Sequence, residues 1–185
     1  LSLTLSSCEQ QSIDNDNTEE PGPEPEPEPE GTRFEAKYSS GAYYSDQYSP
    51  GVDNYFISLS DNGFDANGYV QPNSTYFRFD LYAPKYDGQW QEYMALPVGE
   101  YHYDANDTYA EWTFSADYSE YVTTNDTEVS AKLKFESGKL VVTEELTTFL
   151  GVVEGETFTV KYSGEHVIAN VTPKPMENRE LKVEQ

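Results

Sequence analysis

The chain has 185 residues, 36% hydrophobic and 15% aromatic, which is enough for one domain of about 100–150 residues with a core, plus a tail. Its formal net charge of −23 excludes nucleic acids and anionic membrane surfaces as electrostatic partners. Cys8 is the single cysteine, so no disulfide can form within the chain and packing must stabilise the fold.

The first eight residues end in this cysteine. A run of apolar and small residues precedes it, and an acidic stretch follows it. The tetrad Leu5-Ser6-Ser7-Cys8 resembles the lipobox of bacterial lipoproteins, and with the acidic spacer it resembles the surface lipoproteins of Bacteroidetes. The resemblance implies that residues 1–7 are the remnant of a signal peptide and that a lipid on Cys8 anchors the protein to the outer membrane, exposed at the cell surface. The alternative is an unmodified, exposed cysteine near a chain end.

Residues 9–30 have the composition of a spacer. They contain nine acidic residues and no Lys or Arg, and every second residue from 21 to 29 is proline. We expect an extended, polyproline-like chain of about 3.1 Å per residue that cannot build a core. Four of the acids resemble the surface-export signal of Bacteroidetes lipoproteins, with a solvated linker as the alternative: Asp14, Asp16, Glu19 and Glu20. The predicted organisation is a lipidated cysteine and disordered linker over 8–31, a single β-domain over 32–170 and a loosely ordered tail over 171–185.

From Thr32 onward, apolar and polar side chains alternate with period two. The alternating segments are rich in Val, Thr, Tyr and Phe, which suit a half-buried pleated surface, and no window of 12 residues shows a helical stripe. Turn residues at Ser137-Gly138 and at Glu154-Gly155 predict two hairpins. We therefore expect an all-β fold, an antiparallel β-sandwich of about eight or nine strands, with a lipocalin-like β-barrel as the alternative. The strands are expected near 33–44, 54–60, 75–83, 98–104, 110–118, 128–136, 139–147, 149–153 and 156–163.

One loop has the residues for a calcium site. Asp61, Asp65 and Asn67 follow a predicted strand and bring oxygen donors together within a short, glycine-containing segment. The bidentate Glu that closes an EF-type loop is missing. The alternative is a pair of turns in which Asp and Asn bond their own backbone. Calcium at these three residues is the one cofactor that the sequence suggests.

A second loop has the residues for a ligand site. Tyr86, Trp90 and Tyr93 lie in a polar segment with Asp, Gln and Glu. Exposed aromatic rings beside polar side chains suit a sugar, whose C–H faces stack on the rings while its hydroxyls form hydrogen bonds. The alternative is that Trp90 folds back and caps one end of the domain.

Catalytic motifs are absent from the sequence. It holds no Gly-x-Ser-x-Gly, phosphate loop or dinucleotide fingerprint, and neither His102 nor His166 lies in a recognisable catalytic frame. In layout alone, the chain resembles the accessory lipoproteins of Bacteroidetes glycan-uptake systems. We expect a non-catalytic surface protein that binds a glycan or another extracellular ligand. The alternatives are a structural or adhesin subunit of a surface assembly, joined to a protein partner through edge strands, and a small-molecule or lipid carrier with a hollow barrel.

Overall fold

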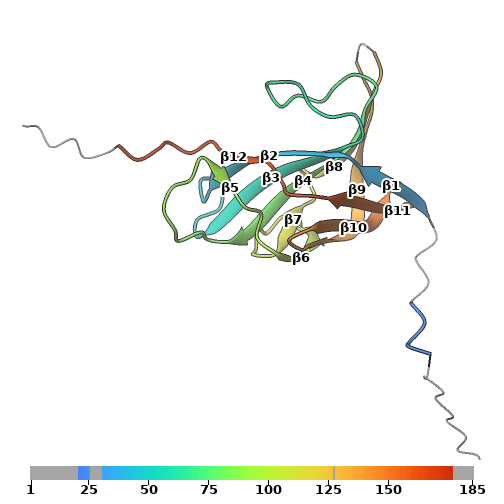
Figure 1. Ribbon diagram of the computed structural model, residues 1–185, viewed down its shortest axis with the longest axis horizontal. Coiled ribbons are helices and arrows are strands. Elements are labelled where there is room, and N and C mark those ends of the chain that lie inside the picture. The colour runs from blue at the N-terminus through green and yellow to red at the C-terminus, as the bar shows by residue number, and fades with distance from the viewer. Residues whose placement is uncertain (1–20, 26–30, 127, 177–185) are drawn as a thin grey trace, which may run out of the picture.

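The computed structural model describes residues 21–25, 31–126 and 128–176, and over these residues the fold is all-β, as predicted (Figure 1). This part of the chain holds no helix, and so none long and apolar enough to cross a membrane. Residues 1–20 and 26–30, which include the predicted lipobox and most of the acidic spacer, lie outside the described residues. The strands are β1 (Thr32–Ala36), β2 (Tyr38–Ser45), β3 (Val52–Ser60), β4 (Thr75–Pro84), β5 (Tyr93–Met94), β6 (Gly99–Asp104), β7 (Thr113–Ser115), β8 (Glu120–Thr124), β9 (Val129–Val142), β10 (Leu146–Val153), β11 (Glu156–Ser163) and β12 (Ile168–Asn170).

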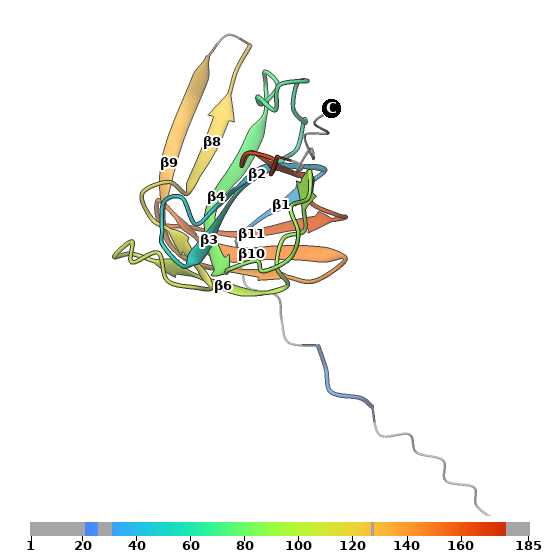
Figure 2. The same ribbon diagram turned by 90° about the vertical axis from the view of Figure 1, so that its left-hand side faces the viewer.

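The strands form one sheet whose middle closes on itself. β4, β8, β9, β6 and β7 pair in turn, and β7 pairs back with β4, which makes a ring of five strands. From β4 the sheet continues through β3, β2, β12 and β5, and from β9 it continues through β10, β11 and β1. These two arms lie on opposite sides of the core (Figure 2), and their inward side chains belong to a single buried cluster.

The arrangement of the strands differs from the expected one. Three described pairs are parallel (β1 with β11, β2 with β12, β6 with β7), and a closed ring with outer strands replaces two separate sheets, so the antiparallel sandwich stays a prediction. The described strands number twelve because the predicted strand at 33–44 is two strands, β1 and β2, and because β5, β8 and β12 lie outside every predicted strand. One strand, β9, runs from the strand predicted at 128–136 into the one predicted at 139–147. The predicted strand at 33–44 divides at Lys37, where the chain stops pairing with β11 and begins to pair with β3.

Two facing glycines make room for the Phe149 ring at the centre of the core. Gly138 of β9 lies opposite Gly151 of β10, and a Cβ on either residue would come within 2.4 Å of the Phe149 ring. The turn predicted at Ser137-Gly138 is therefore wrong: β9 continues through these residues, and the chain turns only after Val142. Glycine serves here to admit a ring and not to reverse the chain. The turn predicted at Glu154-Gly155 is confirmed, with φ of 46° and 74°, as a two-residue hairpin requires.

Phenylalanine rings fill the interior. Phe149 lies 5.1 Å from Phe79 and from Phe135, and 6.1 Å from Phe77 and from Phe114, measured between ring centroids. All five side chains are buried. A lipid carrier needs an empty interior, and here aromatic rings occupy the space between the two arms of the sheet.

We predict that Gly151→Ala lowers the free energy of unfolding by about 2 kcal/mol, since the added methyl group would meet the Phe149 ring at 2.3 Å and the Ser137 carbonyl oxygen at 2.4 Å. Urea unfolding followed by fluorescence measures the change. Gly22→Ala is the matched control, because Gly22 has no atom within 4 Å. Equal stability of the two variants would contradict the role of the glycine pair.

Candidate functional site

A pocket of about 400 Å³ opens on the outer face of β2, β3 and β4. Successive side chains of a strand point to opposite faces, so β3 sends Ile57 into the core and Phe56 to the pocket. On β4 the same alternation sends Leu81 inward and Asp80 outward. We call this site the tyrosine pocket, and its lining residues are Tyr44, Tyr48, Asn54, Phe56, Asp80, Tyr82, Tyr109 and Tyr118.

The strands supply a polar floor. Asp80 is 5% exposed, and its carboxylate accepts hydrogen bonds from Asn54 Nδ2 at 2.7 Å and from the Tyr82 hydroxyl at 3.1 Å. Burial raises the pKa of Asp80, and these two hydrogen bonds oppose the rise. The same amide nitrogen of Asn54 also donates to the Leu81 carbonyl oxygen at 3.2 Å, which fixes its orientation. The floor therefore presents a carboxylate that its neighbours hold in place.

Aromatic rings form the walls and the rim. Tyr44 and Tyr48 meet edge to face with ring centroids 5.7 Å apart, and Tyr82 and Tyr109 lie 4.8 Å apart. At the rim Tyr48 is 59% exposed and Tyr118 is 58% exposed, so both rings are open to a ligand. Large apolar rings cost solvation when they face water. Their convergence on one hollow makes it the candidate site.

Two carboxylates hold the loop between β6 and β7 that carries Tyr109. Asp104 accepts hydrogen bonds from the backbone nitrogen of Thr108 at 2.8 Å and from its hydroxyl at 2.6 Å. Asp107 accepts from the Ser115 hydroxyl at 2.6 Å and from the Ala116 nitrogen at 2.8 Å. Tyr109 itself has a φ of 57°, a left-handed conformation that a tyrosine adopts at a cost. The fold thus holds this wall in position before any ligand arrives.

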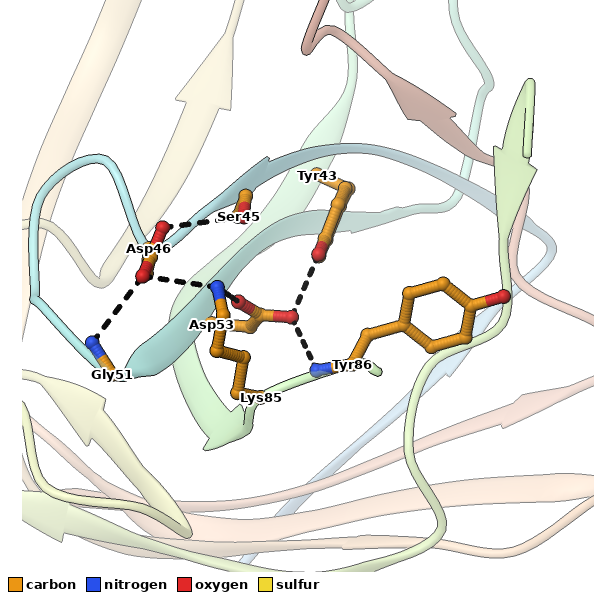
Figure 3. Close-up of polar contacts among 7 residues, drawn as sticks. All are labelled: Tyr43, Ser45, Asp46, Gly51, Asp53, Lys85 and Tyr86. Atoms are coloured by element: carbon orange, nitrogen blue, oxygen red, sulfur yellow. Dashed lines mark hydrogen bonds and ion pairs between the residues drawn. The ribbon is translucent and has the colours of Figure 1, made fainter. Parts of the chain in front are cut away.

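A second cluster, centred on Asp53, holds the hairpin of β2 and β3 (Figure 3). The Asp53 carboxylate is fully buried and accepts hydrogen bonds from the Tyr43 hydroxyl at 2.7 Å and from the Tyr86 backbone nitrogen at 2.8 Å. Its other oxygen lies 3.9 Å from the Lys85 ammonium, which also pairs with Asp46 at 2.9 Å. Burial and the bond to Asp53 raise the pKa of Tyr43 to about 12. The cluster ties the hairpin that carries Tyr44 and Tyr48 to the chain after β4.

The three predicted ligand-binding residues do not converge. The Trp90 indole nitrogen donates to the carbonyl and hydroxyl oxygens of Thr172, and the Lys174 ammonium lies 5.8 Å from the centroid of its ring. The Tyr86 hydroxyl donates to the Gln89 carbonyl oxygen, and the ring packs against the core. Tyr93 is exposed and lines a different cavity. Trp90 therefore contacts the C-terminal segment, and ligand binding by these three residues stays a prediction.

The predicted calcium residues lie in turns. Asp65 Oδ1 accepts hydrogen bonds from the backbone nitrogens of Asn67 at 2.8 Å and Tyr69 at 2.9 Å, and Asp61 Oδ1 accepts from the Thr75 nitrogen at 2.9 Å. Within residues 21–25, 31–126 and 128–176, no group of three or more His, Cys, Asp or Glu side chains is arranged to hold a metal ion. Backbone donors engage the Asp61 and Asp65 carboxylates, and calcium binding there stays a prediction.

A cavity of about 550 Å³ lies between β5, the turn after β9 and the loop that holds His166. Both ring nitrogens of His166 are engaged, Nδ1 with the Ser39 hydroxyl at 2.7 Å and Nε2 with the Thr147 hydroxyl at 2.6 Å. Burial lowers the pKa of this imidazole to about 4. A general base works best with a pKa near the working pH. The Ser39–His166 contact therefore joins β2 to the loop before β12 and is a poor catalytic pair.

Sequence reasoning missed the tyrosine pocket because its residues come from separate segments: three strands, the turn after β2 and the loops that flank β7. The sequence of β4 carries one signal, because Asp80 and the aromatic residue Tyr82 both occupy outward positions. A strand face that water covers needs no aromatic ring. Both residues are buried, which requires other segments to cover them. No protein-family model, curated protein or solved structure matches the chain.

We predict that Asp53→Ala lowers the free energy of unfolding by about 2–4 kcal/mol, because it leaves the Tyr43 hydroxyl and the Tyr86 N–H buried without an acceptor. Lys85→Ala is the matched control and should cost less than about 1 kcal/mol, since its ammonium is exposed. Urea unfolding measures both changes. Similar losses in the two variants would show that the ion pairs, and not the buried hydrogen bonds, hold the hairpin.

We also predict that His166 makes the fold less stable in acid. Its pKa is lower in the folded than in the unfolded chain, so its contribution is complete above pH 6.5 and is lost as the pH falls toward 4, by about 3 kcal/mol in total. His166→Gln should remove that part of the pH dependence of the unfolding free energy. His102→Gln is the control, because the His102 side chain is exposed. An unchanged pH profile in His166→Gln would contradict the prediction.

Proposed function

We propose that this protein is a non-catalytic, lipid-anchored protein of the bacterial outer membrane, exposed at the surface, that binds a glycan in the tyrosine pocket. The observation that carries the proposal is the convergence of six aromatic rings on one hollow whose floor is a hydrogen-bonded carboxylate. Its volume lies within the range of small-molecule sites, which is roughly 300–1,000 Å³.

Sugar chemistry fits such a lining. The C–H faces of a pyranose ring stack on tyrosine rings, and its hydroxyls donate to carboxylates and accept from amides and phenols. Tyr48 and Tyr118 are the exposed rings for stacking, and Asp80 with Asn54 is the polar group that a sugar hydroxyl would meet. The tyrosine pocket holds both the rings and the polar groups together in the folded chain.

The placement of the pocket suits a tethered protein. β1 is the first strand after the acidic spacer, and β2 follows it directly. β2 has eight residues, so its far end lies roughly 25 Å from its start. Tyr44 and Tyr48 lie at that far end, away from the side where the chain enters the domain (Figure 1). A lipid on Cys8 would thus reach the domain at the start of β1, and these two tyrosines lie at the far end of β2.

We predict that the full chain binds at least one member of a chemically diverse panel of oligosaccharides, measured by isothermal titration calorimetry. Tyr48→Ala and Tyr118→Ala should each weaken that binding about two- to tenfold, because each removes one stacking ring and neither ring is needed for folding.

Two control variants separate this pocket from other aromatic residues. Trp90→Ala removes an aromatic ring from the loop that the sequence predicts as the ligand site. Tyr69→Ala removes an exposed ring from the loop between β3 and β4. Both should keep the affinity of the unaltered chain. Binding that Trp90→Ala abolishes and the rim variants preserve would move the site away from the tyrosine pocket, and no binding across the panel would refute the function.

A further inference from the structure

The formal charge in the lining of the tyrosine pocket is negative. Of its eight lining residues, only Asp80 carries a formal charge at neutral pH, and no Lys, Arg or His lines it. The remaining lining consists of five tyrosines, one phenylalanine and one asparagine. A neutral sugar has no need of a buried carboxylate, since uncharged amides and hydroxyls would also bond its hydroxyl groups.

The loops around the pocket add negative charge. Asp107 and Asp117 lie on the two loops that flank β7, and together with Asp80 they raise the pKa of the Tyr109 hydroxyl, after the larger effect of burial. Asp80 and Asp107 have the same effect on Tyr82, again after burial. From Gly31 onward the chain carries 25 acidic and 11 basic residues, so the surroundings reinforce this field.

Arg78 lies beside the pocket, and Arg78, Lys132 and Lys134 each have a carboxylate or carbonyl partner. The Arg78 guanidinium lies over Phe56, 5.0 Å from the ring centroid, and its nitrogen is 3.7 Å from a carboxylate oxygen of Glu120. Lys132 pairs with the same Glu120 at 3.2 Å, and Lys134 donates to the Asp117 carbonyl oxygen. Among the described side chains, the Asp80 carboxylate has hydrogen bonds from Asn54 and Tyr82 and no ion pair.

The aromatic rings of the pocket also favour a ligand with a positive charge. The face of a tyrosine ring carries a negative quadrupole, which attracts an ammonium group placed over it. The tyrosine pocket surrounds its carboxylate with six rings. Tyr82 and Tyr109 lie close together at 4.8 Å, and Tyr82 bonds the carboxylate directly. The rings and the carboxylate would therefore act together on one cationic group.

We propose that the glycan carries a protonated amino group, as a hexosamine without its N-acetyl group does. This proposal rests on the glycan-binding function above and names its ligand class. The sugar ring stacks on Tyr48 and Tyr118, and the ammonium group enters the pocket toward Asp80. The same carboxylate rejects sugars that carry a carboxylate or sulfate, because like charges repel at short range.

The test compares two oligosaccharides of equal length, one of glucosamine and one of N-acetylglucosamine, titrated into the full chain at a pH where the amine is protonated. We expect the glucosamine oligomer to bind about tenfold more tightly or better, since a hydrogen bond between charged groups contributes roughly 1.5–3 kcal/mol. A uronic acid oligomer should bind more weakly than either.

Asp80→Asn is the matched variant. The amide has the shape of the carboxylate, and it can still accept from Asn54 and donate to the Tyr82 oxygen. It should remove the preference, so that the two oligomers bind the variant with equal affinity, and thermal unfolding checks that it folds.

The outcomes separate this inference from the function on which it rests. Equal binding of the two oligomers to the unaltered chain, or tighter binding of the acetylated one, overturns the amino-sugar inference and leaves glycan binding intact. A preference that persists in a folded Asp80→Asn variant also overturns it. If neither these oligomers nor the wider panel bind, both proposals fail.

Discussion

The pairing of β3 with β4 is the constraint on which both the core and the pocket depend. Nine residue pairs join these strands, from Val52 opposite Pro84 to Ser60 opposite Tyr76. Because side chains alternate, this one register places Leu59 and Phe77 in the core and brings Asn54 within 2.7 Å of Asp80 on the other face. A slip of one residue would exchange the two faces and destroy both. The aromatic core thus also fixes the register that assembles the floor of the pocket.

The buried carboxylates of this acidic chain serve two different purposes. Asp53 lies among core residues, and two donors satisfy one of its oxygens, so it holds segments of the fold together. Asp80 also has two donors, yet it lines a hollow that reaches solvent. A buried charge costs free energy unless it is paired. The Lys85 ammonium lies 3.9 Å from one oxygen of Asp53, whereas Asp80 has only hydrogen bonds among the described side chains.

Much of the fold follows from the sequence, because period two is a local property. The all-β class, the alternation along β4 and the turn at Glu154-Gly155 could each be predicted from a few adjacent residues. Gly138 could not, since its role depends on Gly151 across the sheet and on the ring of Phe149. The short strands β5 and β12 escape a pattern that needs four or more residues.

The candidate site was harder to predict than the fold, and Trp90 shows the physical reason. An aromatic residue in a polar loop can serve a ligand only when the fold has not already used its ring and its polar group. Thr172 accepts the Trp90 indole N–H and Lys174 lies over its ring, and both come from a segment about eighty residues away in the sequence. Tyr48 and Tyr118 keep more than half of their surface exposed, and Asp104 and Asp107 form hydrogen bonds within the loops that flank β7. Hydrogen bonds within a loop reduce the entropy that binding must remove, and this would favour binding at the rings that the fold leaves exposed.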